Sequence, residues 1–287
     1  MTSTNDIYQQ VTDRIIAALE AGVTPWLKPW ADSKAGAIGP HNAVTGRQYN
    51  GINWLILGSM PYASGAWLKF KQAKELGGTV RKGEKGTQIV FWSFPKIRDE
   101  ETGKDKVVPF AKGYTVFHAE QCEGLNLDKI KHPAPIVAGE TPINTIAVKS
   151  GAVVNHGGSR AFYNSGTDSI GMPSAASFQS ADHYASTLAH ELVHWTGHKS
   201  RCDRQFGKRF GDDAYAFEEL VAEIGSAFVC AQAGIPLDGL QHDSYVASWL
   251  RVLKDDKRAI FTASSAAKKA AEMLLAEAQE EEAQEAA

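Results

Sequence analysis

The sequence predicts an α+β protein in two parts. Apolar residues at helical spacing occupy residues 5–21 and much of residues 186–228, whereas residues 88–117 hold short segments typical of an antiparallel sheet. A run containing Pro133, Pro135, Gly139 and Pro142 separates the two parts. We therefore expect a small α+β domain over residues 1–130, a linker over residues 131–142 and a second domain over residues 143–287, whose acidic end frays.

The first part combines helices with a small sheet. Residues 5–21 predict an amphipathic helix that stops at Gly22, and residues 67–76 predict a basic helix that stops at Gly77. Between them, residues 41–54 are rich in turns and lead into a short helix over residues 52–57, a composition more typical of a binding loop than of a packed one. Strands are expected at residues 88–94, 107–110 and 114–117, with a hairpin tip at residues 99–104.

The net charge of −3 conceals an uneven distribution. Residues 1–130 contain 16 Lys and Arg against 13 Asp and Glu, a balance of +3, and the remainder contains 14 against 20, a balance of −6. Within residues 65–112 the balance is 11 against 6, or +5. A basic region beside an acidic one indicates an anionic ligand for the first part, nucleic acid above all, although a solvated charged face gives the same pattern.

Aromatic side chains accompany these cations, as they do in proteins that stack unpaired bases. The segment around Trp26, Lys28 and Trp30 has this character, although tryptophans also serve as core anchors. Lysines and arginines gathered at one end of the predicted sheet would form a phosphate-binding edge. The expected single-stranded-DNA contacts are Trp26, Lys28, Trp30, Arg47, Tyr49, Asn53, Trp54, Lys69, Lys71, Lys74, Arg81, Lys82 and Lys85.

The second part contains the pattern H-E-x-x-H within a helical segment, residues 186–195. His190 and His194 are four residues apart, so both imidazoles lie on one helix face and can hold one metal ion. Glu191 is placed to take a proton from an attacking water as a general base. The pattern also arises by chance, so a third ligand is needed to support it.

A second helical segment, residues 215–225, supplies candidates for that ligand. Glu219 and Glu223 share one face of an otherwise apolar helix, the arrangement of gluzincin metallopeptidases. We assign Glu219 as the third metal ligand and Glu223 as a partner that hydrogen-bonds a metal-binding histidine, with Glu218 as the alternative ligand. His198, four residues beyond His194, is a weak candidate because Gly197 is expected to end the helix. Zinc is the default ion for such a set and Mn²⁺ the alternative.

Residues 161–173 predict a hairpin just before the H-E-x-x-H helix. In zincins an edge strand at this place pairs with an extended peptide substrate. Tyr163 and Asp168 are candidates to face that cleft, and a hairpin turn explains Asp168 equally well.

Cysteine usage and hydropathy indicate the compartment. Cys122, Cys202 and Cys230 form no C-x-x-C pair and are too few for a disulfide framework, which fits a reducing environment. Asp6, Asp13 and the lack of a long apolar core near the start lead us to expect no signal peptide, and no run approaches about 18 consecutive apolar residues. We expect a cytoplasmic protein with no membrane partner.

Several separated motifs, in the same order, resemble the ArdC antirestriction family over nearly the whole chain. They are Asp6-Ile7-Tyr8, Thr24-Pro25-Trp26, Thr45-Gly46-Arg47, Gly51-Ile52-Asn53, residues 83–87, residues 116–121, residues 190–198 and residues 218–223. The resemblance implies a protein of conjugative plasmids or other mobile elements, with an N-terminal single-stranded-DNA-binding domain and a C-terminal zincin-like metallopeptidase domain. It also implies that the protein protects incoming DNA from host restriction.

Two hypotheses follow. In the first, the protein coats entering single-stranded DNA and the metal site is structural or regulatory. In the second, it is a metalloprotease that cleaves a host restriction enzyme or another protein, and DNA binding only localises it. The residues name no peptide substrate.

Overall fold

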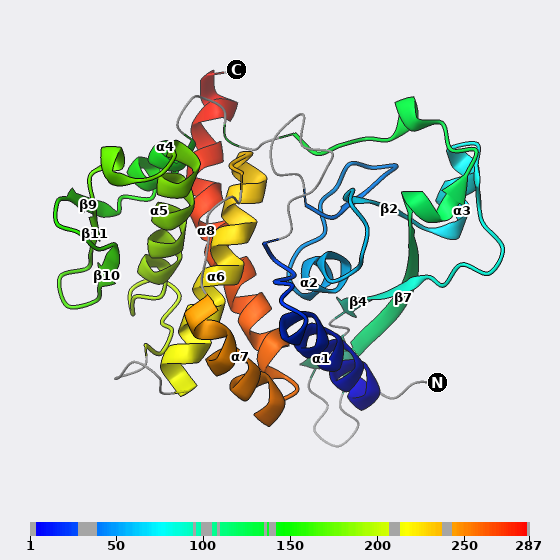
Figure 1. Cartoon of the computed structure of the whole chain (residues 1–287), viewed down its shortest axis with the longest axis horizontal. Coiled ribbons are helices and arrows are strands. Elements are labelled where there is room, and N and C mark those ends of the chain that lie inside the picture. Colours follow the sequence, from blue (N-terminus) through cyan, green and yellow to red (C-terminus); the bar gives the residue numbers. More distant parts are fainter. Residues whose placement is uncertain are drawn as a thin grey trace.

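A computed structural model describes residues 4–27, 39–93, 96–98, 105–107, 110–134, 137, 142–206, 213–236 and 243–285. It has the predicted α+β architecture. Helices of the second part stand side by side on one side of the molecule, and the longest strands lie on the other (Figure 1).

The first part begins with helix α1 (Thr4–Glu20), which confirms the predicted amphipathic helix. Helix α2 (Ile52–Gly58) also lies where it was expected. The prediction of one helix over residues 67–76 was wrong: strand β2 (Ala66–Leu68) comes first and helix α3 (Phe70–Glu75) follows. Lys69 has an extended backbone and its N–H donates to the Gln72 side chain at 2.8 Å, so the helix begins only after it.

The main sheet has the strand order β1-β2-β7-β4, with β1 at His41–Asn42. Strand β4 (Thr87–Ser93) pairs antiparallel with β7 (Phe110–His118) along its whole length. The two strands expected at residues 107–110 and 114–117 are therefore not divided as predicted, because the β4 pairing runs unbroken through residues 110–116. Strands β5 (Lys96–Arg98) and β6 (Asp105–Val107) form a separate pair, as do β3 (Thr79–Val80) and β8 (Cys122–Glu123). The hairpin tip expected at residues 99–104 lies outside the described residues.

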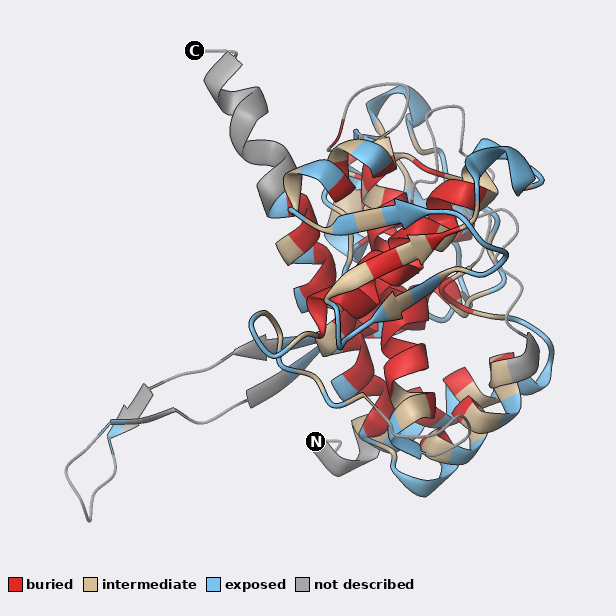
Figure 2. Cartoon of the chain, turned by 90° about the vertical axis from the view of Figure 1, so that its left-hand side faces the viewer, coloured by how far each residue is buried: buried red, intermediate tan, exposed pale blue. Residues whose placement is uncertain are grey.

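In the second part, the described residues form five α-helices and a small sheet. The helices are α4 (Pro142–Lys149), α5 (Ala181–Thr196), α6 (Asp213–Ala233), α7 (Asp243–Asp255) and α8 (Ala259–Glu285). Strand β11 (Ser169–Met172) lies between β10 (Phe162–Asn164) and β9 (Val153–His156), and the β10–β11 pair is the predicted hairpin. Figure 2 shows these strands crossing in front of the buried helices, with β10 at one edge of the sheet.

One hydrophobic cluster extends from the first part into the second. Trp26 packs edge-on against Trp249 of α7 with ring centroids 5.6 Å apart, and Trp54 of α2 packs against Phe228 of α6 at 5.4 Å. The two parts therefore share a core, and the predicted boundary at residues 131–142 stays a prediction. Among the described helices, none combines the length and apolarity that crossing a membrane requires.

Candidate metal centre and nucleic-acid interface

Helix α5 presents the H-E-x-x-H residues from a firmly defined segment. Its first turn is capped by Ser180, whose hydroxyl accepts from the N–H of His183 at 3.0 Å, and its last turn ends at Gly197. His190 and His194 are both buried, and their Nε2 atoms lie 3.1 Å apart. The spacing of four residues thus brings the two ligand atoms together as predicted.

Helix α6 runs close beside α5. It is buried over most of its length, which explains why its sequence is mostly apolar around its glutamates. Gly225 sits against Val193 of α5, and a Cβ at this position would lie 2.8 Å from a methyl carbon of Val193. Glycine therefore allows the two backbones to approach, and this approach brings the glutamates within reach of the histidines.

The carboxylate of Glu219 faces both histidine Nε2 atoms. Its oxygens lie 3.5 Å from that of His190 and 3.7 Å from that of His194, and the three donor groups lie within 4.8 Å of one another. Metal–nitrogen and metal–oxygen bonds of ~2.0–2.2 Å can join donors at these separations to one ion. The donor set fits a divalent metal with Glu219 as third ligand.

The outer ring nitrogens each meet a different carboxylate. Nδ1 of His190 lies 3.2 Å from Glu223, the partner assigned from the sequence, and Nδ1 of His194 lies 3.1 Å from Glu218. Glu218 also accepts from the guanidinium of Arg204 at 2.8 and 2.9 Å. Since its oxygens are occupied behind the His194 ring, Glu218 fits a role in orienting the ligand better than the alternative role as a ligand. The contribution of Arg204 carries no signal in the sequence.

The buried carboxylates shift the pKa values of the histidines. Burial by itself lowers the pKa of His190, but hydrogen bonds to Glu219 and Glu223 outweigh it and raise that pKa well above its ordinary value. For His194, burial is likewise outweighed by Glu218 and Glu219, which raise its pKa to about 9. Burial raises the pKa of Glu219, yet contact with the two imidazoles produces a net lowering. The carboxylate of Glu219 is thus kept ionised, as a metal ligand requires.

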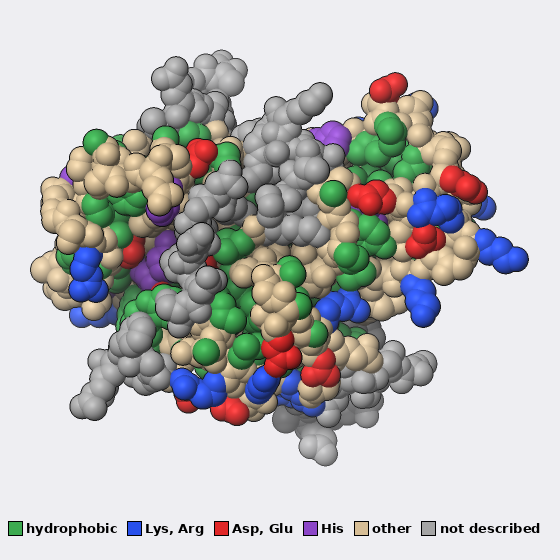
Figure 3. Space-filling model, viewed as in Figure 1, with side chains coloured by type: hydrophobic (Ala, Val, Ile, Leu, Met, Phe, Trp, Pro, Cys, Tyr) green, Lys and Arg blue, Asp and Glu red, His purple; other side chains and the backbone are tan. Residues whose placement is uncertain are grey.

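His190, His194 and Glu219 line a cleft of about 490 Å³. Glu191 lines this cleft beside them, together with Phe162 and Tyr163 of the edge strand β10 and with Tyr215 and Tyr245. Figure 3 shows histidine side chains at the surface on the left-hand side of the molecule. Strand β10, the candidate base and the candidate metal ligands therefore line one cleft.

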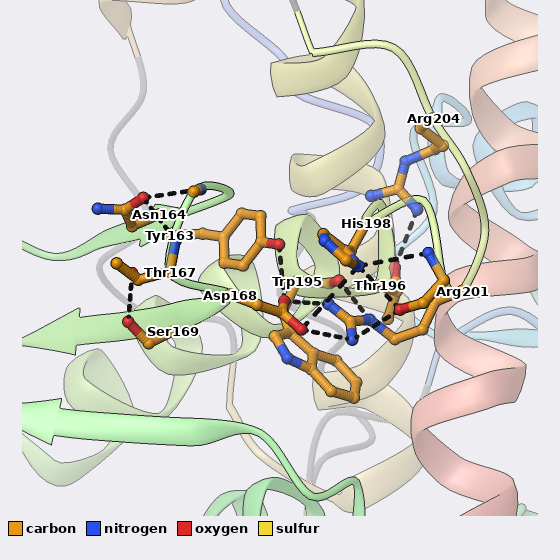
Figure 4. A network of polar contacts seen from close by, with 12 residues as sticks. Tyr163, Asn164, Thr167, Asp168, Ser169, Trp195, Thr196, His198, Arg201 and Arg204 are labelled. Carbon is orange, nitrogen blue, oxygen red and sulfur yellow. Dashed lines mark hydrogen bonds and ion pairs between the residues drawn. The ribbon is translucent and has the colours of Figure 1, made fainter.

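A polar network ties the β10–β11 hairpin to the end of α5 (Figure 4). The hydroxyl of Tyr163 donates to Asp168 at 2.8 Å, and Asp168 also accepts from the guanidinium of Arg201. Arg201 lies 3.7 Å above the ring of Trp195, the residue after His194. The network thus links the hairpin in the cleft wall to the end of the helix that carries the candidate metal ligands. His198 lies 4.0 Å from Asp168 and is not part of the donor cluster.

Some of the predicted DNA contacts lie in the core. Trp26 is fully buried and Trp54 is 2% exposed, so neither ring offers an open stacking face. The buried side chain of Asn53 exchanges two 2.8 Å hydrogen bonds with the backbone of Val90, which joins α2 to β4. These three residues therefore pack or form hydrogen bonds inside the protein, where the sequence had predicted DNA contacts. Lys28 and Trp30 lie outside the described residues.

The other predicted cations are exposed, and Tyr49 is partly buried. The exposed ones are Arg47, Lys69, Lys71, Lys74, Arg81, Lys82 and Lys85. Arg81 is paired with Glu84 at 2.7 Å. Figure 3 shows Lys and Arg side chains spread over the right-hand side of the molecule.

We name a set of aromatic and cationic side chains the β4–β7 face: Lys69, which was among the predicted contacts, and Phe91, Lys112 and Tyr114, which sequence reasoning missed. Phe91 is 46% exposed and packs edge-on against Tyr114 at 5.2 Å. The amines of Lys69 and Lys112 lie 5.1 and 5.3 Å from the centre of the Tyr114 ring. Phe91 pairs directly with Lys112 in the β4–β7 register, so strand alternation could have placed them together had the pairing been known.

A helix offering two imidazoles, a neighbouring helix offering a carboxylate, and an edge strand beside the cleft together define the zincin-like class, and residues 141–266 match the family described as zincin-like metallopeptidase. Residues 5–117 match the N-terminal domain of anti-restriction factor ArdC. The chain belongs to the ArdC antirestriction family, as the sequence resemblance implied.

Two crystal structures of an ArdC protein support this assignment. The crystal structure of metal-free ArdC from plasmid R388 is 46% identical, covers 95% of this chain and 98% of that one, and has a TM-score of 0.78. The Mn(II)-bound structure of the same protein is 44% identical, covers 96% and 99% of the two chains, and has a TM-score of 0.77. DNA primase TraC of Escherichia coli is 40% identical over 94% of this chain, which spans 27% of the length of that primase.

Proposed function

We propose that this protein binds single-stranded DNA through its first part and protects incoming DNA from host restriction, and that its second part carries a divalent-metal centre of the gluzincin kind. The observation that carries the binding proposal is the β4–β7 face, where the exposed ring of Phe91 packs against the partly buried ring of Tyr114 and two lysine amines lie near the Tyr114 ring. Unpaired bases stack on such rings while cations hold the phosphates. The further exposed cations Lys71, Lys74, Lys82 and Lys85 would extend the phosphate contacts.

Binding to a labelled dT20 oligonucleotide at several salt concentrations tests this proposal. Affinity should fall steeply with salt, because each neutralised phosphate of a single strand contributes roughly −0.7 to the slope of log K against log[salt]. Replacing Phe91 and Tyr114 by Ala should weaken binding without changing that slope. The proposal fails if affinity ignores ionic strength.

The metal centre would be held by His190, His194 and Glu219. A divalent ion bound there would act as a Lewis acid toward a carbonyl oxygen and an attacking water. Glu191 lines the same cleft and would accept the proton of that water, and Glu218 and Glu223 would fix the orientations of the two imidazoles. Zinc suits two imidazoles and a carboxylate, and the Mn(II)-bound state of the R388 relative supports manganese as the alternative.

A second candidate function is proteolysis of a host protein, such as a restriction enzyme, with DNA binding serving to localise the protease. The edge strand β10 favours it, because an extended peptide can add to such an edge directly beside Glu191. A restriction-protection assay during DNA entry separates the two functions. Glu191→Gln should keep metal and DNA binding, so full protection by this variant would eliminate the protease function.

The matched variant for that assay replaces Lys69, Lys71, Arg81 and Lys82 by Glu. It leaves the metal cleft intact and reverses the charge that would hold the strand. We expect this variant to lose protection, and retention of protection would contradict the single-strand-binding proposal.

A further inference from the structure

A second cavity, distinct from the metal cleft, lies where the first part meets helix α6. It has a volume of about 290 Å³ and is lined by Arg47, Gln48, Tyr49, Asn50, Trp54, Pro133, Ala134, Phe228 and Gln232. Trp54 and Phe228 are buried and close its inner end, and Arg47, Asn50 and Ala134 are exposed at its mouth. The proposed metal chemistry uses none of these residues.

The residues that line the cavity limit the class of ligand that it can bind. Flat apolar surfaces are supplied by Tyr49 and Pro133, and amide groups, which both donate and accept hydrogen bonds, by Gln48, Asn50 and Gln232. Among the described residues that line the cavity, none is an aspartate or glutamate. A planar, uncharged ring with hydrogen-bonding edges fits these walls, and a cationic ligand does not.

Arg47 adds a site for an anion at the mouth. Its side chain is exposed, and no carboxylate of the described residues pairs with it. A guanidinium in this position suits a phosphate attached to the ring that enters the cavity. Rings joined to phosphates are the units of a nucleic-acid strand.

The loop that forms the mouth is preformed. The Asn42 side chain accepts from the backbone N–H groups of Val44 and Thr45 at 3.1 and 3.0 Å, and Gly46 turns the chain with a φ of 74°. The N–H of Tyr49 donates to the carbonyl of Pro40 at 2.7 Å. Binding would therefore not require this loop to order first.

We propose that this cavity takes a single unpaired nucleobase of the bound strand, with its phosphate on Arg47. The inference rests on the proposed single-strand binding and adds a site to it. At the lower end of the ~300–1,000 Å³ range of small-molecule pockets, the cavity holds one base with its sugar and no longer segment.

The test compares the dissociation constants of the full chain for dT20 and for an abasic strand of 20 nucleotides. Gln232→Leu removes an amide, and Ala134→Trp blocks the mouth. Both should reduce the preference for dT20 over the abasic strand roughly tenfold, the worth of one well-held base, and leave the salt slope unchanged. Gln10→Leu, an exposed glutamine of α1, is the matched control and should change neither quantity.

A preference unchanged within twofold in both folded variants would overturn the nucleobase site and leave the proposed function standing. Failure of the wild-type chain to bind dT20 at all would overturn both the proposed function and the nucleobase site. If the variants do not fold, saturation-transfer NMR of the wild-type chain with dTMP decides. Magnetisation should reach the protons of the base, and its absence there would overturn the proposal.

Discussion

The candidate metal centre and the β4–β7 face differ in how their charges are balanced: buried partners balance those of the first, and solvent balances those of the second. At the candidate metal centre, His190, His194 and three glutamates are buried, and the contacts between the histidines and the glutamates depend on the packing of α5 against α6. On the β4–β7 face, Lys69 and Lys112 are exposed near the ring of Tyr114, and their charges are solvated. Removing one member of a buried group of charges leaves another charge buried without a partner, which is strongly destabilising. Removing one exposed charge has only a small effect.

This difference predicts how each region responds to substitution. Loss of one group at the metal centre should act almost as a switch, because the remaining charges stay buried without a partner. Loss of one lysine from the β4–β7 face should change affinity by a small step that salt can mimic.

The largest effect is expected for Glu219→Gln. Loss of a ligand carboxylate should weaken metal binding more than loss of an orienting partner, which typically costs about 10–100-fold. Glu218→Gln, the adjacent change on the same helix, should stay within that smaller range. Isothermal titration of both variants with Zn²⁺ and Mn²⁺ measures the difference, and the reverse ranking would make Glu218 the third ligand.

A change in helix packing should have a moderate effect on the same site. Gly225→Ala would place a methyl group 2.8 Å from Val193 and push α6 away from α5. We expect a loss of about 1–3 kcal/mol in the free energy of unfolding, with weaker metal binding, because the glutamates move with the helix. Denaturant unfolding measures the first quantity, and Gly83→Ala at an open turn, where only φ strain applies, serves as a comparison.

The exposed region should respond more weakly. Lys112→Ala is expected to reduce affinity for dT20 a few-fold and to lower the salt slope by about 0.7, the contribution of one phosphate contact. Metal affinity should not change. An unchanged slope would mean that Lys112 contacts no phosphate.

The smallest effect concerns the network beside the cleft. A hydrogen bond from Arg201 holds the pKa of Asp168 below its ordinary value. A carboxyl group with a lowered pKa in the folded state adds stability above its unfolded-state pKa, and this stability is lost as the pH falls through the folded-state value. Asp168→Asn should therefore reduce stability at neutral pH and flatten its decline in acid, as thermal unfolding between pH 2 and pH 7 would detect.

The same contrast explains what could be predicted from the sequence. The spacing of His190, His194, Glu219 and Glu223 follows from helix geometry alone, so a correct helix assignment placed these groups correctly. The β4–β7 face depends on which strands pair and in what register. Phe91 and Lys112 were therefore not predicted to be neighbours. Trp26 was misjudged because its position opposite Trp249 is set by a contact between the ends of the chain.

The proposed metal site can be tested by anomalous diffraction from crystals of this protein grown with Mn²⁺ or Zn²⁺. We expect one ion bonded to Nε2 of His190, Nε2 of His194 and the carboxylate of Glu219, with Glu218 still held by Arg204. An ion elsewhere in the chain, or one bonded to Glu218 in place of Glu219, would contradict it.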